Sequence, residues 1–336
     1  MVTTTKINNR RYLGNKYRLL PFISDVISTE CGNFESFADL FAGTGAVSSA
    51  FTDKTLYTND ILYSNYLCHL TWFSDEFFDI SKIENHIEFY NSNIPFEENY
   101  MTLNFSDTYF SKKNCSKIGF IRDNIENEYK KGIINTRERA MLITSLLYAI
   151  DKIANTCGHY DAFRKGVLFP ETFTMRVPEP NSKLKHNHCY NKDTNDLVKE
   201  ISVDVAYIDP PYNSRQYCDS YHLIENIARW EKPEVFGVAR KMDRTALKSK
   251  YCTRSAPEAF KDLINNLSAK YIVVSYNNMA NKGNDRSNAR ISDAQILETL
   301  SSKGSVKIYS EQFKAFTTGQ SEHLDNEERL FVCKCN

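Results

Sequence analysis

The chain has no net charge, no long apolar run and no Cys-x-x-Cys motif. Its 336 residues contain 42 Lys and Arg and 42 Asp and Glu, so the formal net charge is zero. This balance excludes a uniformly basic nucleic-acid-binding protein, but it does not exclude a chain whose charges are segregated. The longest nearly apolar stretch, residues 140–150, contains Thr144 and Ser145 and is too short to cross a bilayer core of about 30 Å. We therefore expect a buried helix there and no membrane segment.

The cysteines indicate a reducing environment. There are 9 of them, and none belongs to a Cys-x-x-Cys pair. The first residues show no apolar region typical of a secretory leader. Together these features predict a cytoplasmic protein without disulfides. His186, His188 and Cys189 lie close together but lack a second ligand pair at zinc-site spacing. We expect no metal there and interpret the segment as a polar loop that enters a strand.

Short β-rich runs alternate with helix-like periodicity along much of the chain. The runs are residues 36–41, 56–59, 203–208, 271–276, 305–309 and 330–333. This alternation is typical of an open, mostly parallel α/β sheet. The last two runs lie close together, so we expect an antiparallel hairpin at the sheet edge.

A different pattern fills residues 63–185. Few strands are legible there, residues 136–155 predict a long helix, and Pro170, Pro178 and Pro180 mark a loop-rich stretch. We expect a largely helical insertion between two strands of the sheet. The predicted division is therefore a sheet domain of residues 1–62 and 186–336, with residues 63–185 inserted as a second domain.

The zero net charge hides segregated charge. Residues 6–18 contain five bases and no acid, and residues 229–254 contain eight bases and three acids. Residues 75–107 contain eight acids and one base. Such runs are more often solvated faces than binding surfaces. They would gain meaning only where they flank a functional site.

A glycine turn follows the first predicted strand. Asp39 and Phe41 precede Gly43 and Gly45, and small residues at a turn let a ligand approach the backbone. The third glycine of a dinucleotide fingerprint is absent, which suits a nucleoside ligand without a pyrophosphate. Asp60 ends the second predicted strand, where an acid can accept hydrogen bonds from ribose hydroxyls. The alternatives are a plain strand–helix turn and a helix-capping aspartate.

The most specific motif is Asp209-Pro210-Pro211-Tyr212 at the end of a buried strand. The two prolines fix φ and remove N–H donors, which leaves a stiff loop with acceptor carbonyls. A carboxylate, a carbonyl and an aromatic face are the groups that can hold the exocyclic amino group of a planar base. The alternative is a rigid turn with a packing tyrosine.

The combination of the glycine turn with Asp-Pro-Pro-Tyr resembles the S-adenosylmethionine-dependent amino methyltransferases of DNA. The segment Arg-Tyr-Leu-Gly-Asn-Lys at residues 11–16 resembles the amino-terminal motif of their Dam-like N6-adenine group. The order of the motifs and the long insertion are similar too. The resemblance implies a class I methyltransferase-like, Rossmann-type open sheet in which the helical insertion recognises the target.

The resemblance also implies roles for individual residues. Those it assigns to the S-adenosylmethionine pocket are Tyr12, Lys16, Asp39, Phe41, Ala42, Gly43, Gly45, Asp60, Ile61 and Asp193. Tyr12 and Lys16 would close over the methionine end, and Asp193 would contact the adenine of the cofactor. Asp209 and the Pro210 carbonyl would bind the N6 amino group of a flipped adenine, with Tyr212 stacked on the base. No covalent nucleophile is needed.

Residues near these motifs are candidates for DNA contact. The candidates are Arg215, Tyr217, His159, Tyr160, Arg240, Lys241 and Arg244. A polar loop explains Arg215 and Tyr217 nearly as well, and a satisfied core histidine is the commoner interpretation of His159. The polar segment from Ser275 to Arg290 is a candidate second phosphate clamp or a lid.

The predicted reaction is methyl transfer to adenine N6 in a specific duplex DNA sequence, by a restriction–modification or orphan modification enzyme. Cytosine N4 in DNA, adenine in RNA and a non-catalytic binding module stay open as alternatives. The glycine spacing disfavours a nicotinamide oxidoreductase. Expected partners are double-stranded DNA and a separately encoded restriction endonuclease, with the chain a monomer or weak dimer.

Overall fold

The computed structural model describes residues 3–10, 12–156, 158–180, 186–277, 289–312 and 327–336. The chain forms two compact units. The helical unit comprises Met1–Leu13, Leu62–Leu184 and Cys218–Thr245. The sheet unit comprises Gly14–Ile61, Lys185–Tyr217 and Ala246–Asn336. The helical unit thus includes, besides the predicted insertion, one segment before it and one after it in the chain, Met1–Leu13 and Cys218–Thr245, which we had expected in the sheet domain.

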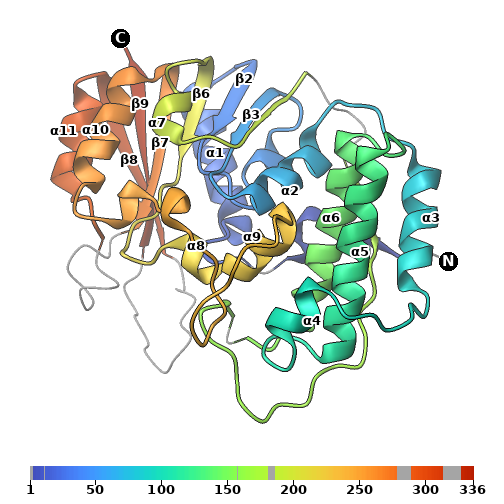
Figure 1. The fold of residues 1–336 in the computed structure, drawn as a ribbon. Coiled ribbons are helices and arrows are strands. Elements are labelled where there is room, and N and C mark those ends of the chain that lie inside the picture. The colour runs from blue at the N-terminus through green and yellow to red at the C-terminus, as the bar shows by residue number, and fades with distance from the viewer. Residues whose placement is uncertain (1–2, 11, 157, 181–185, 278–288, 313–326) are drawn as a thin grey trace. The chain divides into compact units, whose positions relative to one another are not determined.

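A seven-stranded sheet forms the sheet unit, in the order β5-β3-β2-β6-β7-β9-β8. Its strands are β2 (Ser36–Asp39), β3 (Thr55–Asn59), β5 (His188–Tyr190), β6 (Ser202–Ile208), β7 (Ser268–Asn277), β8 (Gly304–Gln312) and β9 (Glu327–Cys335) (Figure 1). The five from β5 to β7 run parallel, whereas β9 is antiparallel to both β7 and β8. This arrangement confirms the predicted open, mostly parallel sheet and its antiparallel edge hairpin, and it is consistent with a class I methyltransferase fold.

The strand order reverses between β2 and β6. From β2 the chain continues to β3 on one side, and from β6 it continues to β7 on the other. Open α/β sheets bind ligands at the carboxyl ends of the strands at such a switch point. Asp39 pairs with Tyr207 in the β2–β6 register, so both strands end at the same edge. The segments after β2 and β6 are therefore placed to form a site.

Helices cover both faces of the sheet. The apolar core includes residues of α7 (Thr194–Leu197), α10 (Ala256–Asn266) and α11 (Asp293–Ser301) on one face, together with Val306 of β8. Lys307 points to the opposite face because side chains alternate along a strand. There its ammonium lies 2.8 Å from Glu30 of α1 (Leu20–Cys31), so α1 covers that second face.

The helical unit is built around one buried helix. Its elements are α2 (Tyr63–Phe73), α3 (Ile80–Asn91), α4 (Tyr100–Phe105), α5 (Lys112–Lys130), α6 (Thr136–Ile150), α9 (His222–Arg229) and a parallel pair of β1 (Thr4–Thr5) with β4 (Val177–Pro178), while α8 (Tyr217–Ser220) starts at the unit boundary. Every residue of α6 after Thr136 is buried, which confirms the expected buried helix. No helix in the described part of the chain is long and apolar enough to span a membrane.

The chain leaves α6 earlier than the sequence suggested. The helix ends at Ile150, whereas the periodicity predicted a helix to residue 155. Asp151 binds Arg10 and Tyr160 through its side chain, and Asn155 donates its backbone N–H to the Tyr109 carbonyl at 2.9 Å. After Ile150 the backbone continues only as turns, with the Ala154 N–H on the Ile150 carbonyl at 2.9 Å, and these contacts hold the segment that follows the helix.

The segment 218–245 joins the helical unit through a buried carboxylate. Glu225 of α9 is fully buried and accepts the backbone N–H groups of Tyr63 at 2.8 Å and Ser64 at 2.9 Å. These are donors of the first turn of α2, which has no side-chain cap of its own. A residue after the Asp-Pro-Pro-Tyr motif therefore caps the first helix of the insertion, which explains why the unit boundary differs from the predicted one.

Truncation in α6 should destabilise the helical unit strongly. Leu146 is 0 % exposed, whereas Leu103 of α4 is 66 % exposed. We expect Leu146→Ala to lower the free energy of unfolding by about 2–5 kcal/mol, because it leaves a cavity. Leu103→Ala, the matched control, should change it by less than about 0.5 kcal/mol. Urea unfolding followed by circular dichroism measures both, and equal losses would contradict the central place of α6.

Candidate active site in the sheet unit

The glycine turn after β2 is held by the neighbouring strand β3. Ala42 donates its N–H to the Asn59 carbonyl at 2.9 Å, and Gly43 donates to the Asp60 carboxylate at 3.0 Å. Gly43 and Gly45 have φ of 55° and 86°, a region that favours glycine. The turn is therefore tight and fixed at the carboxyl edge of the sheet.

The buried Asp39 side chain stabilises this turn through a hydrogen bond. The residue is 1 % exposed, and its carboxylate accepts the Ser48 hydroxyl at 2.8 Å. Burial raises the pKa of Asp39 to about 7, against the opposing effect of the Ser48 hydrogen bond. Ser48 occupies the place of the third glycine in a dinucleotide fingerprint, and the sequence did not predict its contact with Asp39.

The other predicted cofactor residues meet at the same edge. Asn191, after β5, donates to the carbonyls of Asp60 at 2.8 Å and Ile61 at 2.9 Å. The exposed Asp193 caps α7 and accepts the Asn195 N–H at 2.9 Å. The half-buried Phe41 ring lies edge-on to Tyr251, with centroids 5.0 Å apart. The ends of β2, β3 and β5 thus bring the glycine turn, Asp60 and Asp193 to one edge.

A lysine lies between two carboxylates at the end of β6. The Lys16 ammonium is 3.1 Å from Asp209 Oδ1 and 3.0 Å from Glu328 Oε1. The side chains of Lys16, Asp209 and Glu328 are only 8 %, 17 % and 7 % exposed. Burial alone would lower the pKa of Lys16, but the two carboxylates raise it well above its usual value. Burial raises the pKa of Asp209 to about 7, and Glu328 adds to the rise while Lys16 opposes it.

The Asp-Pro-Pro-Tyr loop is held from its far side. The Tyr212 carbonyl accepts the Arg290 N–H at 2.8 Å and the Tyr276 hydroxyl at 3.4 Å. The Tyr212 ring lies edge-on to Tyr276, with centroids 6.3 Å apart, and stays half-buried. Pro210 is buried. The backbone of the loop is thus held by hydrogen bonds, and the Asp209 carboxylate of the loop contacts the Lys16 ammonium.

The amino-terminal motif is divided between the two units. Tyr12, in the helical unit, stacks on Tyr221 at 4.6 Å and accepts a hydrogen bond from Asn65 at 2.9 Å. Lys16, in the sheet unit, binds Asp209. Its predicted contact with the methionine end of a cofactor stays a prediction, while the structure shows its contact with the Asp-Pro-Pro-Tyr motif. Arg11 lies outside the described residues.

The structure explains why the amino-terminal motif has a glycine at position 14. Its φ is +74°, and a Cβ placed there would lie 2.8 Å from the Tyr217 hydroxyl. Tyr217, a candidate DNA contact, therefore closes against the amino-terminal motif within the sheet unit. Arg215, two residues before it, is exposed.

The remaining DNA candidates lie in the helical unit, where most have intramolecular partners. Tyr160 is 3 % exposed, and its hydroxyl binds Asp151. Lys241 lies 2.6 Å from Asp161, Arg244 lies 2.7 Å from Asp219, and the ring of His159 lies 3.6 Å from Asp161. Arg240 is exposed. DNA contact by these residues stays a prediction, and for Tyr160 the arrangement shown is one of packing.

Part of the predicted site lies outside the described residues, namely residues 278–288 of the polar segment that follows Ser275. Glu328 was missed as a site residue, whereas Ser275 had been predicted only as the start of a phosphate clamp or lid. Glu328 shares the inward face of β9 with Leu330, because the two are separated by one residue in a strand. The signal available in the sequence was a charged residue at an alternate position of a strand whose next two residues on that face are apolar.

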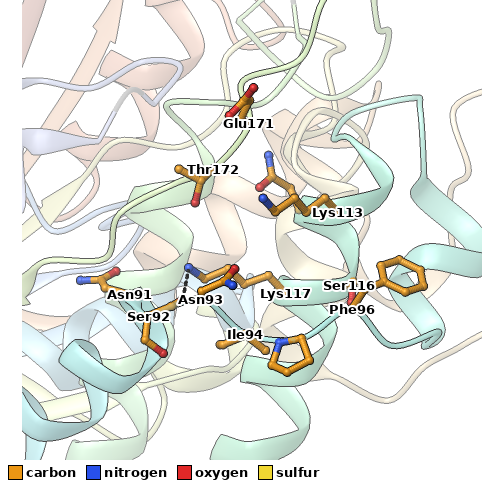
Figure 2. A pocket seen from close by; sticks show the side chains of 12 residues that line it. Asn91, Ser92, Asn93, Ile94, Phe96, Lys113, Ser116, Lys117, Glu171 and Thr172 are labelled. Atoms are coloured by element: carbon orange, nitrogen blue, oxygen red, sulfur yellow. Dashed lines mark hydrogen bonds between the residues drawn. The ribbon is translucent and has the colours of Figure 1, made fainter.

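The helical unit has a polar hollow that the sequence did not suggest. It lies among the loop after α3, the start of α5 and the segment at Glu171 and Thr172, as Figure 2 shows. Lys113 and Lys117 line it, and Lys117 donates to the Ser92 carbonyl at 3.3 Å. None of the residues assigned to the cofactor or target base by the sequence lines this hollow.

Comparison with known proteins identifies the family. The profile described as "D12 class N6 adenine-specific DNA methyltransferase" matches residues 12–287. Modification methylase LlaI of Lactococcus lactis subsp. lactis is 34 % identical over 95 % of this chain and 53 % of its own length. Modification methylase StsI of Streptococcus sanguinis is 36 % identical over 80 % of this chain and 44 % of its own length.

The chain spans about half the length of these two relatives. It matches the type II methyltransferase M.NlaIII of Neisseria lactamica over almost the whole of both proteins, at 29 % identity over 94 % of this chain and 95 % of the relative. The profile match contains both the glycine turn and the Asp-Pro-Pro-Tyr loop. The resemblance seen in the motifs is thereby confirmed, and the chain belongs to the D12 class family of N6 adenine-specific DNA methyltransferases.

Proposed function

We propose that the chain transfers a methyl group from S-adenosylmethionine to the N6 amino group of an adenine in a specific duplex DNA sequence. The observation that carries the proposal is the Lys16–Asp209 ion pair of 3.1 Å at the end of β6. It places the carboxylate of the Asp-Pro-Pro-Tyr loop at the switch point of the sheet, next in strand order to the glycine turn. Family membership supports the reaction class.

Asp209 and Pro210 would activate the target amino group. The lone pair of an exocyclic adenine nitrogen is delocalised into the ring, so the nitrogen is a weak nucleophile. Hydrogen bonds from the amino group to the Asp209 carboxylate and the Pro210 carbonyl would draw its hydrogens out of the base plane and localise the lone pair. The half-buried Tyr212 ring offers a face for stacking. Catalysis then rests on positioning and electrostatics.

The residues around the glycine turn fit an S-adenosylmethionine molecule. The cofactor supplies an electrophilic methyl group on its sulfonium. Gly43 and Gly45 adopt positive φ and carry no Cβ, so the turn can stay tight and would let a cofactor approach its backbone. Asp60 would bind ribose hydroxyls, the exposed Asp193 would accept from the adenine amino group, and Phe41 would line the pocket.

The helical unit is proposed to recognise DNA. A base inside a duplex cannot reach Asp209, so the target must leave the stack at a cost of a few kcal/mol. Residues 63–185 are the proposed recognition domain, and the exposed Arg240 is the proposed phosphate contact nearest to α9 in the sequence. The relatives are named modification methylases. By analogy, this chain would act in the cytoplasm and protect the host DNA by methylating it. It would act as a monomer or weak dimer, beside a separately encoded restriction endonuclease.

Replacing Asp209 should abolish methyl transfer without abolishing cofactor binding. We expect Asp209→Ala to lower the single-turnover rate on duplex DNA at least about 100-fold, because the amino group loses its charged acceptor. Titration calorimetry with S-adenosylmethionine should show a Kd close to that of the wild type. Undiminished transfer by this variant would overturn the proposed role, and methylation of RNA in preference to duplex DNA would overturn the substrate.

Replacing Asp60 should act on the cofactor instead. Asp60→Ala removes the acceptor of the Gly43 N–H and the proposed ribose ligand, so binding of S-adenosylmethionine should weaken by about 1–3 kcal/mol. Asp53→Ala, in the turn before β3 and with a side chain 70 % exposed, is the control and should bind as the wild type does. Calorimetry compares the two variants. Equal affinity for both would contradict the ribose role.

DNA affinity should depend on salt in spite of the zero net charge. Each phosphate contact contributes about one to the slope of log affinity against log salt. We expect Arg240→Gln to reduce this slope by about one and to weaken binding to all sequences alike. Lys130→Gln, an equal change of charge at an exposed residue of α5, is the control. Fluorescence anisotropy at several salt concentrations measures the slopes, and a slope unchanged by Arg240→Gln would exclude this contact.

A further inference from the structure

Glu328 contacts the same lysine as Asp209 does. Its Oε1 lies 3.0 Å from the Lys16 ammonium and accepts the Ser275 hydroxyl at 2.7 Å. Both neighbours donate to the same oxygen, an arrangement that an ionised carboxylate satisfies. The side chain is only 7 % exposed, so solvent screens this charge little. One ammonium therefore serves two carboxylates, Asp209 and Glu328.

The edge hairpin delivers this residue to the site. β9 runs antiparallel to β7, and their register places Glu328 across from Asn277 near the carboxyl end of β7. Glu328 and Ser275 point to the same face of the sheet, as their hydrogen bond requires. Strands that run parallel to β6 end at this edge, whereas β9 begins there. β9 therefore contributes Glu328, near the start of the strand, to this edge of the sheet.

The charge balance around Asp209 follows from these neighbours. Five charged or titratable groups interact electrostatically with Asp209. They are Lys16 before α1, Asp39 at the end of β2, Tyr207 of β6, Tyr212 and Glu328 of β9. Lys16 is the only cation among these five. With Asp209 and Glu328 both ionised, the ammonium can neutralise only part of the charge on Asp209. Asp209 then keeps more of its strength as a hydrogen-bond acceptor.

We infer that Glu328, held by Ser275, is a positioning residue that draws the Lys16 ammonium partly away from Asp209 and so keeps the Asp209 carboxylate a strong acceptor for the target amino group. The inference rests on the proposed function, because it assigns the amino group to Asp209. It adds a residue outside the Asp-Pro-Pro-Tyr loop, from the last strand of the chain. Without the Glu328 charge, Lys16 would pair with Asp209 alone and stabilise its ionised form.

The test is the pH dependence of methyl transfer. Ionised Asp209 is the stronger acceptor, so kcat/KM for DNA should fall as the pH decreases through the pKa of Asp209, which burial raises to about 7. In Glu328→Gln, loss of a nearby negative charge should lower this pKa and move the acid limb about one pH unit lower. The single-turnover rate on the high-pH plateau should fall about 10-fold, because Asp209 is a weaker acceptor when fully paired. The Kd of S-adenosylmethionine should stay within about twofold of the wild-type value.

Matched variants separate this role from a structural one. Glu30→Gln removes a carboxylate that also pairs with a lysine, Lys307, at 2.8 Å in the same unit, and it should leave the acid limb in place. Ser275→Ala should move the limb in the same direction as Glu328→Gln but less far, because it weakens the support of the Glu328 charge. This second variant also decides the matter if Glu328→Gln does not fold.

Two results would overturn the inference. They are an acid limb that does not move in Glu328→Gln or Ser275→Ala, and a limb that moves equally in Glu30→Gln. Either result would leave the proposed function standing as long as Asp209→Ala is inactive. Full activity of Asp209→Ala would instead remove the proposed function itself.

Discussion

The ammonium of Lys16 is buried, and the site depends on how that charge is neutralised. An ion withdrawn from water costs several kcal/mol unless it is paired with good geometry, and removing one partner of such a pair commonly costs about 3–5 kcal/mol. Asp209 at 3.1 Å and Glu328 at 3.0 Å meet this requirement. The segment before α1, the loop after β6 and the start of β9 must therefore converge on one point. The same convergence presents the Asp209 carboxylate at the edge of the sheet.

The glycine turn is fixed in an analogous way, by polar groups from neighbouring strands. Asp60 accepts the Gly43 N–H at 3.0 Å, and Asp39 accepts the Ser48 hydroxyl at 2.8 Å. These contacts lie within the chain itself and fix the turn at the carboxyl edge of the sheet. Preorganised dipoles and charges lower the cost of reorganisation during the reaction. Both halves of the proposed site therefore lie on the rigid ends of strands rather than on long loops.

Local patterns predicted the features that depend on local sequence. Six strands of the seven-stranded sheet, all but β5, the edge hairpin and the buried α6 followed from runs of β-branched, aromatic and apolar residues. The two main motifs marked the ends of β2 and β6. The features that the sequence did not predict depend on distant partners. The end of α6 at Ile150 depends on Arg10 and Tyr160 holding Asp151. The role of Glu328 depends on Lys16 at the other end of the chain.

The most direct test of the account identifies the methylated base. Duplex DNA of random sequence is incubated with the full chain and methyl-labelled S-adenosylmethionine, digested to nucleosides and separated by chromatography. The account predicts label in N6-methyladenine, and none when Asp209 is replaced by alanine. Label in N4-methylcytosine would contradict the proposed target atom, and no labelled nucleoside from a chain that binds the cofactor and DNA would contradict catalysis by this site.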